Sequence, residues 1–107
     1  MSGITPDTIT PDKLRAADKV RNATWLPILA SCGPMLADAI EIADSCARAD
    51  IECHCLGVST DDDLRWYDTH VGAIMEWEAI AQAIRYLTFR GLIERHPGHG
   101  EWVRFKA

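Results

Sequence analysis

The C-terminal third of the chain constrains the fold most strongly. An apolar helical pattern there stops at a glycine and gives way to two strand-like segments. The apolar residues of this pattern share one helix face, as in a helix that packs on a core: Trp77, Ile80, Ala81, Ile84 and Leu87. Gly91 follows at the position where helix C-termini favour glycine. Residues 92–95 and 101–106 have the composition of strands and flank a Pro-Gly turn. The segment predicts a helix followed by a small C-terminal β-hairpin.

Two more helices are expected in the first half of the chain. Threonine is favoured at the N-cap of a helix and proline at the first helical position, as at Thr10 and Pro11. An apolar pattern at Leu14, Ala17 and Val20 follows them. Pro27 should bend or end this helix. After the break at Gly33-Pro34, a second helix is expected from about residue 34 to 49, with its apolar positions three and four residues apart.

The middle of the chain is less regular. Residues 51–60 alternate weakly, so either a short strand or a loop fits them. Thr60 precedes three aspartates, Asp61 to Asp63, and acidic residues are favoured in the first turn of a helix. A helix over residues 61–70 is therefore predicted, with the aspartates as its N-terminal cap.

The length and composition of the chain indicate one globular domain. The 107 residues are enough for a single core, and we expect an arm over residues 1–12 and one domain over residues 13–107. The fold class predicted is mainly α with a small C-terminal hairpin. No apolar run approaches the roughly 18 residues of a membrane span, and the N-terminus lacks the pattern of a signal peptide. A cytoplasmic protein without membrane contact is expected.

The stretch from Ala79 to Arg95, with its Arg90-Gly91-Leu92-Ile93 corner, resembles winged-helix transcription regulators. The resemblance implies a winged-helix-like domain in which the helix before Gly91 contacts DNA and the turn around Pro97-Gly98 is the tip of the wing. A homodimer would suit this role. The nucleic-acid contacts that the resemblance implies are Gln82, Arg85, Tyr86 and Arg90 on the helix, and Arg95, His96, His99, Arg104 and Lys106 on the wing.

Charge is distributed unevenly along the chain. Sixteen acidic residues outnumber eleven basic ones, which gives a net charge of −5 and no general attraction to phosphates. Between residues 85 and 106, however, five residues are basic and only two are acidic. Such a local excess of positive charge is expected of a DNA-binding surface on an acidic protein. Glu76 and Glu78 depart from the winged-helix pattern because they would repel DNA at the start of the recognition helix.

Two functions therefore compete. The first is a winged-helix DNA-binding transcriptional regulator. The alternative is a small acidic adaptor or inhibitor that uses the same scaffold to bind a basic protein, which could itself bind nucleic acid. Exposed aromatic side chains beside Arg85 and Arg90 would suit either interface, and Tyr86 and Phe89 lie off the apolar stripe. No group of residues points to an enzyme, a catalytic site or a cofactor.

The cysteines and histidines allow two interpretations each. Cys32, Cys46, Cys53 and Cys55 could hold zinc, but their spacing matches no common finger, so buried thiols are the prediction and no metal is expected. His96 and His99 flank the Pro-Gly turn and are interpreted as exposed neutral side chains rather than as a metal or pH-sensing site.

Overall fold

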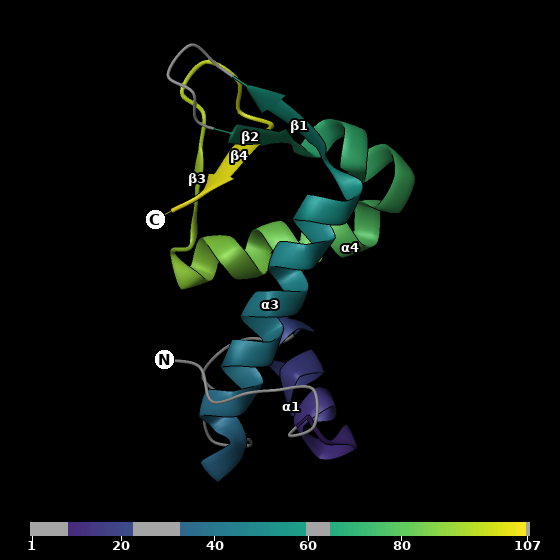
Figure 1. Ribbon diagram of the computed structural model, residues 1–107, viewed down its shortest axis with the longest axis vertical. Coiled ribbons are helices and arrows are strands. Elements are labelled where there is room, and N and C mark those ends of the chain that lie inside the picture. The colour runs from purple at the N-terminus through teal and green to yellow at the C-terminus, as the bar shows by residue number, and fades with distance from the viewer. Residues whose placement is uncertain (1–8, 23–32, 60–64, 107) are drawn as a thin grey trace. The chain divides into compact units, whose positions relative to one another are not determined.

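The computed structural model describes residues 9–22, 33–59 and 65–106. These residues form three α-helices, one short 3-10 helix and four strands in a single antiparallel sheet (Figure 1). The prediction of a mainly helical fold with a small β component is confirmed, and the β component is a four-stranded antiparallel sheet. Contacts within the chain divide it into two units, residues 1–46 and 47–107, and each is described by itself. In the described part of the chain, no helix is long and apolar enough to cross a membrane.

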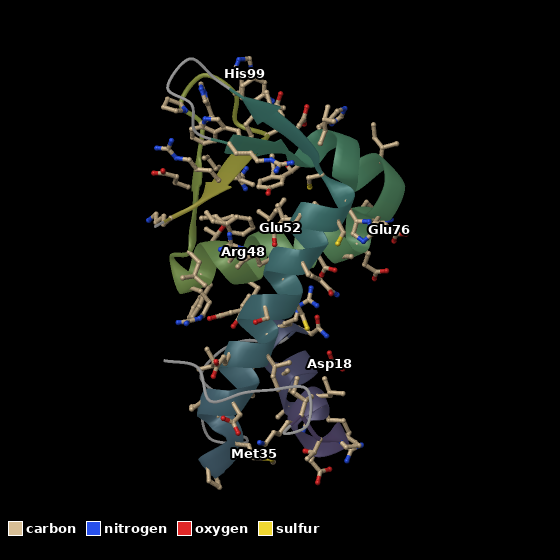
Figure 2. All side chains as sticks on the ribbon, viewed as in Figure 1. Asp18, Met35, Arg48, Glu52, Glu76 and His99 are labelled. Carbon is tan, nitrogen blue, oxygen red and sulfur yellow. The ribbon has the colours of Figure 1, made fainter. Side chains whose placement is uncertain are left out.

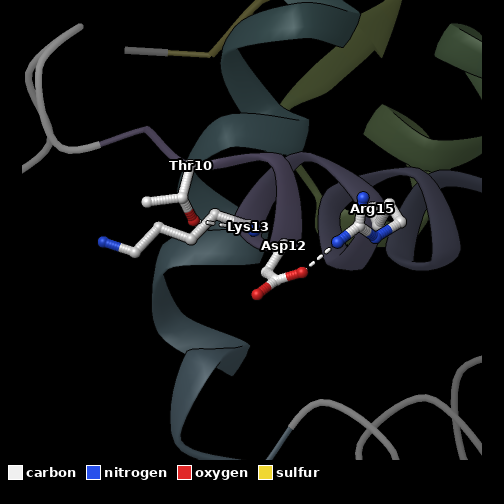
Figure 3. A network of polar contacts seen from close by, with 4 residues as sticks. All are labelled: Thr10, Asp12, Lys13 and Arg15. Carbon is white, nitrogen blue, oxygen red and sulfur yellow. Dashed lines mark hydrogen bonds and ion pairs between the residues drawn. The ribbon is translucent and has the colours of Figure 1, made fainter.

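The first helix of unit 1, α1 (Pro11–Asn22), begins where the sequence predicts. The Thr10 hydroxyl oxygen accepts a hydrogen bond from the Lys13 backbone N–H at 3.3 Å, as expected of an N-cap residue. Asp12 lies in the first turn, where the helix dipole favours a carboxylate, and forms an ion pair with Arg15 (Figure 3). The bend predicted at Pro27 lies outside the described residues.

The 3-10 helix η2 (Gly33–Met35) leads into α3 (Leu36–His54). An ion pair of 2.9 Å between Lys13 and Asp38 links α1 to α3 within unit 1. Both helices bury small apolar side chains: Ala16, Ala17 and Val20 in α1, and Ala39, Ile42 and Ala43 in α3. The helix predicted over residues 34–49 thus exists but continues to His54, so the expected strand or loop begins later.

The strands of unit 2 are β1 (Leu56–Ser59), β2 (Arg65–Asp68), β3 (Ile93–Arg95) and β4 (Trp102–Phe105), in the order β1-β2-β4-β3. All neighbours are antiparallel, and β4 lies between β2 and β3. The helix predicted over residues 61–70 is wrong, because residues 65–68 form strand β2, which pairs with β1 along its length and with β4 through Tyr67 and Asp68. Asp61 to Asp63 lie outside the described residues.

The long helix α4 (Thr69–Arg90) begins at a different cap from the one predicted. The Asp68 carboxylate accepts a hydrogen bond from the His70 backbone N–H at 3.0 Å. At Glu76 the backbone leaves the helical region (φ −139°, ψ 60°), which divides α4 into a first segment, residues 69–75, and a second segment, residues 77–90. Gly91 ends the helix in the left-handed conformation (φ 69°), as predicted from its position.

The core of unit 2 lies between α4 and one face of the sheet. The second segment of α4 buries Ile80, Ala83, Tyr86 and Leu87, and α4 contacts β1, β3 and β4 (Figure 1). Because side chains alternate along strands, the sheet has an inner face and an outer face. The inner face carries Tyr67, Ile93, Val103 and Phe105, and the outer face carries Trp66, Glu94, Trp102 and Arg104. The Tyr67 and Phe105 rings meet edge-on at 5.7 Å, and Arg48 of α3 lies over Phe105 at 4.2 Å (Figure 2).

Candidate functional site

Exposed apolar side chains concentrate on α4. Among the described residues, five large hydrophobic side chains are exposed, and α4 carries three of them: Ile74 (71%), Trp77 (68%) and Phe89 (58%). Trp77 belongs to the stripe predicted to be buried, so that prediction is wrong for it, and Ala81 of the same stripe is exposed as well. Large apolar side chains that stay exposed next to one another, as a contiguous patch, are typical of a surface that is covered in a complex.

Two of these side chains, Trp77 and Phe89, belong to one continuous face of the second segment. The exposed residues of this segment are Trp77, Glu78, Ala81, Arg85, Thr88 and Phe89, which we call the α4 face. Their spacing of mainly three and four residues places them along one side of the helix. The opposite side packs on the sheet through Ile80, Ala83 and Leu87. The α4 face therefore points away from the core of unit 2.

A groove runs between α4 and the turn that joins β3 to β4. Its volume is about 390 Å³. One wall is apolar and comes from Trp77, Ile80, Ala81 and Ile84. The remaining lining residues are Thr69, His70, Arg95, Gly100 and Glu101. The groove thus offers an apolar wall beside an exposed tryptophan, with charged groups on the facing rim.

Hydrogen bonds fix the two walls of the groove to each other. The Glu101 carbonyl oxygen accepts from the Thr69 hydroxyl at 2.6 Å and from the Thr69 backbone N–H at 2.9 Å. Arg95 donates to the Gly100 carbonyl oxygen at 2.7 Å, which holds the turn closed. Since Thr69 is the first residue of α4, the start of this helix and the turn are held at a set separation.

Charge along α4 changes sign from one end to the other. Glu76, which is labelled in Figure 2, and Glu78 are exposed where the second segment begins, and the helix dipole favours carboxylates there. Arg85 is exposed two turns later, and Arg90 is the last residue of the helix. The part of the helix predicted to enter a DNA groove first is therefore acidic and apolar.

The structure separates the residues predicted to bind nucleic acid. Tyr86 is only 1% exposed and belongs to the core, so the prediction that it contacts DNA is wrong. Arg104 is half-buried on the outer face of the sheet, away from α4. It pairs there with Glu94 and lies 4.4 Å from the centre of the Trp66 ring. The other predicted contacts are exposed or half-buried: Gln82, Arg85, Arg90, Arg95, His96, His99 and Lys106.

An aromatic cluster on the outer face was not predicted. The His96 ring lies edge-on to Trp66 at 4.8 Å and to Trp102 at 5.4 Å. His99 stacks on Trp102, with ring centres 4.0 Å apart (His99 is labelled in Figure 2). The indole N–H of Trp66 is buried, and no residue that the structure describes accepts a hydrogen bond from it. The two histidines are therefore packed against tryptophans. The prediction of exposed loop side chains missed these contacts, which join β2 to the turn between β3 and β4.

The described cysteines differ in exposure. Cys46 and Cys53 are exposed, which contradicts the prediction of buried thiols for them, and Cys55 is buried as predicted. Burial, reinforced by the negative charge of Asp68, raises the pKa of the Cys55 thiol to about 11. Cys32 lies outside the described residues. Within the described ranges, no three His, Cys, Asp or Glu side chains gather in a way that could hold a metal ion.

Comparisons of the chain with protein-family models, curated proteins and solved structures find no match.

Proposed function

We propose that unit 2, with α3, is a winged-helix-like domain that works as a protein-binding module through the α4 face. Three features support the winged-helix part. The two segments of α4 around Glu76 supply a pair of consecutive helices, as a helix-turn-helix requires. The second segment ends at Gly91, and the antiparallel strands β3 and β4 follow it with a short turn between them. The third feature is the order of these elements, two helical segments followed by two antiparallel strands, which is the order expected of a recognition helix and its wing.

The observation that carries the protein-binding part is the exposure of Trp77 at 68% beside the groove. Tryptophan is enriched at the centres of protein interfaces, where an indole loses its water and gains wide apolar contact. Glu76 and Glu78 next to it disfavour a phosphate backbone and favour a partner with basic side chains. The partner is thus a protein that presents an apolar side chain to the groove and a positive charge to the glutamates.

Photo-crosslinking tests this proposal. A photoreactive amino acid would replace Ala81 on the α4 face, or Asp18 on α1 as a control, in the full chain expressed in its native cells. We expect protein adducts from position 81 and not from position 18. The replacement Trp77→Ala should reduce the adducts, whereas Leu14→Ala, at another exposed apolar residue, should not.

The proposal would be contradicted by adducts that contain nucleic acid alone, or by equal yields from the two positions. Adducts that persist at full yield in Trp77→Ala would contradict the role of the tryptophan.

DNA binding as a transcriptional regulator is the second candidate. It is favoured by the exposed side chains of Arg85, Arg95 and Lys106, which are available to phosphates, and by the winged-helix-like order of elements. In this case the same helix would enter the major groove, and the acidic start of the second segment would lie outside the contact. Salt-dependent binding of duplex DNA is its test.

A further inference from the structure

The α4 face is complementary to itself. It carries Glu78 near one end, Arg85 near the other, and the small Ala81 between them, all exposed. Glu78 and Arg85 are seven residues apart on one helix, a rise of about 10 Å, and their side chains form no ion pair with each other. Neither forms an ion pair with any other residue that the structure describes. Two unpaired opposite charges therefore remain at the two ends of one exposed apolar face.

We propose that the partner of the α4 face is a second copy of this chain, bound through an antiparallel pair of α4 helices. The inference rests on the proposed protein-binding function and names its partner. In a two-fold symmetric contact, if residue i of one copy meets residue j of the other, then j meets i as well. An axis passing beside Ala81 and Gln82 places Glu78 opposite Arg85 of the second copy, and the reverse pair forms by symmetry.

The apolar residues fit the same arrangement. Trp77 precedes Glu78, so its indole lies alongside Arg85 of the second copy, where a guanidinium can cover an aromatic face. Ala81 at the crossing point has no bulk to hold the helices apart, and Thr88 leaves room for the indole at each end. Trp77 and Phe89, now 68% and 58% exposed, would both lose water contact in the pair.

The size of the face sets the expected strength of binding. The second segment spans 14 residues, so the contact is at the small end of specific interfaces, which usually bury about 1,600 Å² in total. A dimer with a dissociation constant on the order of micromolar is expected from such an area with one buried tryptophan on each side.

Sedimentation velocity of the full chain over a micromolar concentration series tests the pairing. The wild type should shift from monomer to dimer. Glu78→Arg and Arg85→Glu should each weaken the dimer about tenfold or more, because each reversal turns two attractive pairs into two repulsive ones. Asp18→Arg and Lys19→Glu make the same charge changes at exposed positions of a different helix, α1, and should leave the dimer unchanged.

A mixture of the two single variants gives the sharpest result. In Glu78→Arg both positions are basic, and in Arg85→Glu both are acidic, so each variant repels itself but attracts the other. An equimolar mixture should form a heterodimer at concentrations where each variant alone is monomeric. The double variant, Glu78→Arg with Arg85→Glu, should recover most of the wild-type affinity. Far-UV circular dichroism of every variant checks that the helices are intact.

A wild type that stays monomeric over the whole series would overturn the inference. So would a dimer that neither reversal affects, or single variants that do not associate when mixed. If the chain is monomeric and position 81 still crosslinks to another protein, the inference fails while the proposed function stands. If position 81 crosslinks only to nucleic acid, the proposed function fails as well.

Discussion

At the scale of single residues, the described cysteines show how surroundings control chemistry. Cys55 is buried directly after the end of α3, whereas Cys46 and Cys53 are exposed on that helix. Burial disfavours the thiolate, and the carboxylate of Asp68 adds to this effect, so the pKa of Cys55 rises from 9.0 to about 11. A thiol with a raised pKa reacts slowly, because the thiolate is the nucleophile.

We therefore expect Cys55 to resist alkylation. At pH 8, a pKa raised by two units lowers the thiolate fraction about 100-fold, and burial limits access further. A time course of iodoacetamide labelling, read by peptide mass spectrometry, should show Cys46 and Cys53 modified long before Cys55. Labelling of all three at one rate in the folded protein would contradict the burial of Cys55. Labelling in denaturant, where the three should react alike, is the control.

The same shift links stability to pH with a definite sign. The folded state holds the Cys55 proton more tightly than the unfolded state, so the unfolded chain loses this proton first as pH rises. The contribution of Cys55 to the free energy of unfolding is therefore complete below pH 9.0 and declines between pH 9.0 and about 11.

Local residue signals predicted some features of the fold and missed others. The Thr10 cap and the Gly91 stop depend on bonds within a few residues, so the sequence was enough to find them. The acidic run at Asp61 to Asp63 had the same appearance as a cap, yet α4 is capped by Asp68. The capping signal alone could not distinguish these positions, because the choice depends on where β2 pairs.

At the scale of elements, β2 and α4 show why strand pairing and the buried side of a helix could not be predicted from the sequence. β2 has four residues, too few for an alternating pattern to stand out, and its bonds go to β1 and β4, the latter more than thirty residues away. For α4, periodicity indicated a helix but not which side is buried. The buried side includes Ala83 and Tyr86 rather than Trp77 and Ala81, which also removed Tyr86 from the candidate site.

Two neighbouring aromatic residues on α4 test this orientation. Tyr86→Ala should lower the free energy of unfolding by about 3–5 kcal/mol, because it empties a fully buried site. Phe89→Ala, one turn away on the exposed side, should cost less than about 1 kcal/mol. Urea unfolding followed by circular dichroism, at protein concentrations below any self-association, measures both. Similar losses for the two variants, or a larger loss for Phe89→Ala, would show that the helix is turned differently.

At the scale of the whole molecule, net charge is the main obstacle to DNA binding. With −5 overall, the chain must rely on a local set of basic side chains to hold phosphates. The structure keeps Arg85, Arg95 and Lys106 exposed but removes Tyr86 into the core and holds Arg104 beside Glu94. Few phosphate contacts remain for the regulator hypothesis.

That hypothesis makes a quantitative prediction. If the chain binds DNA, replacing Arg85 and Arg90 by alanine should weaken binding and lower the slope of log affinity against log salt by about one unit per lost phosphate contact. Fluorescence anisotropy of labelled duplexes at several salt concentrations measures this slope. Lys19→Ala on α1 is the control. If binding is salt-sensitive but the double variant has the same slope, these arginines do not contact DNA. If the chain does not bind DNA even at low salt, the regulator hypothesis is wrong.

The double hydrogen bond between Thr69 and Glu101 has a consequence for which substitutions the chain tolerates. Thr69 contributes its side-chain hydroxyl, but position 101 contributes only its carbonyl oxygen, which every amino acid possesses. In a saturation mutagenesis screen for folded protein, position 69 should accept serine and little else, while position 101 should accept most residues. The side chain at position 101, on the groove rim, can therefore change during evolution without loss of the two hydrogen bonds that hold α4 to the turn.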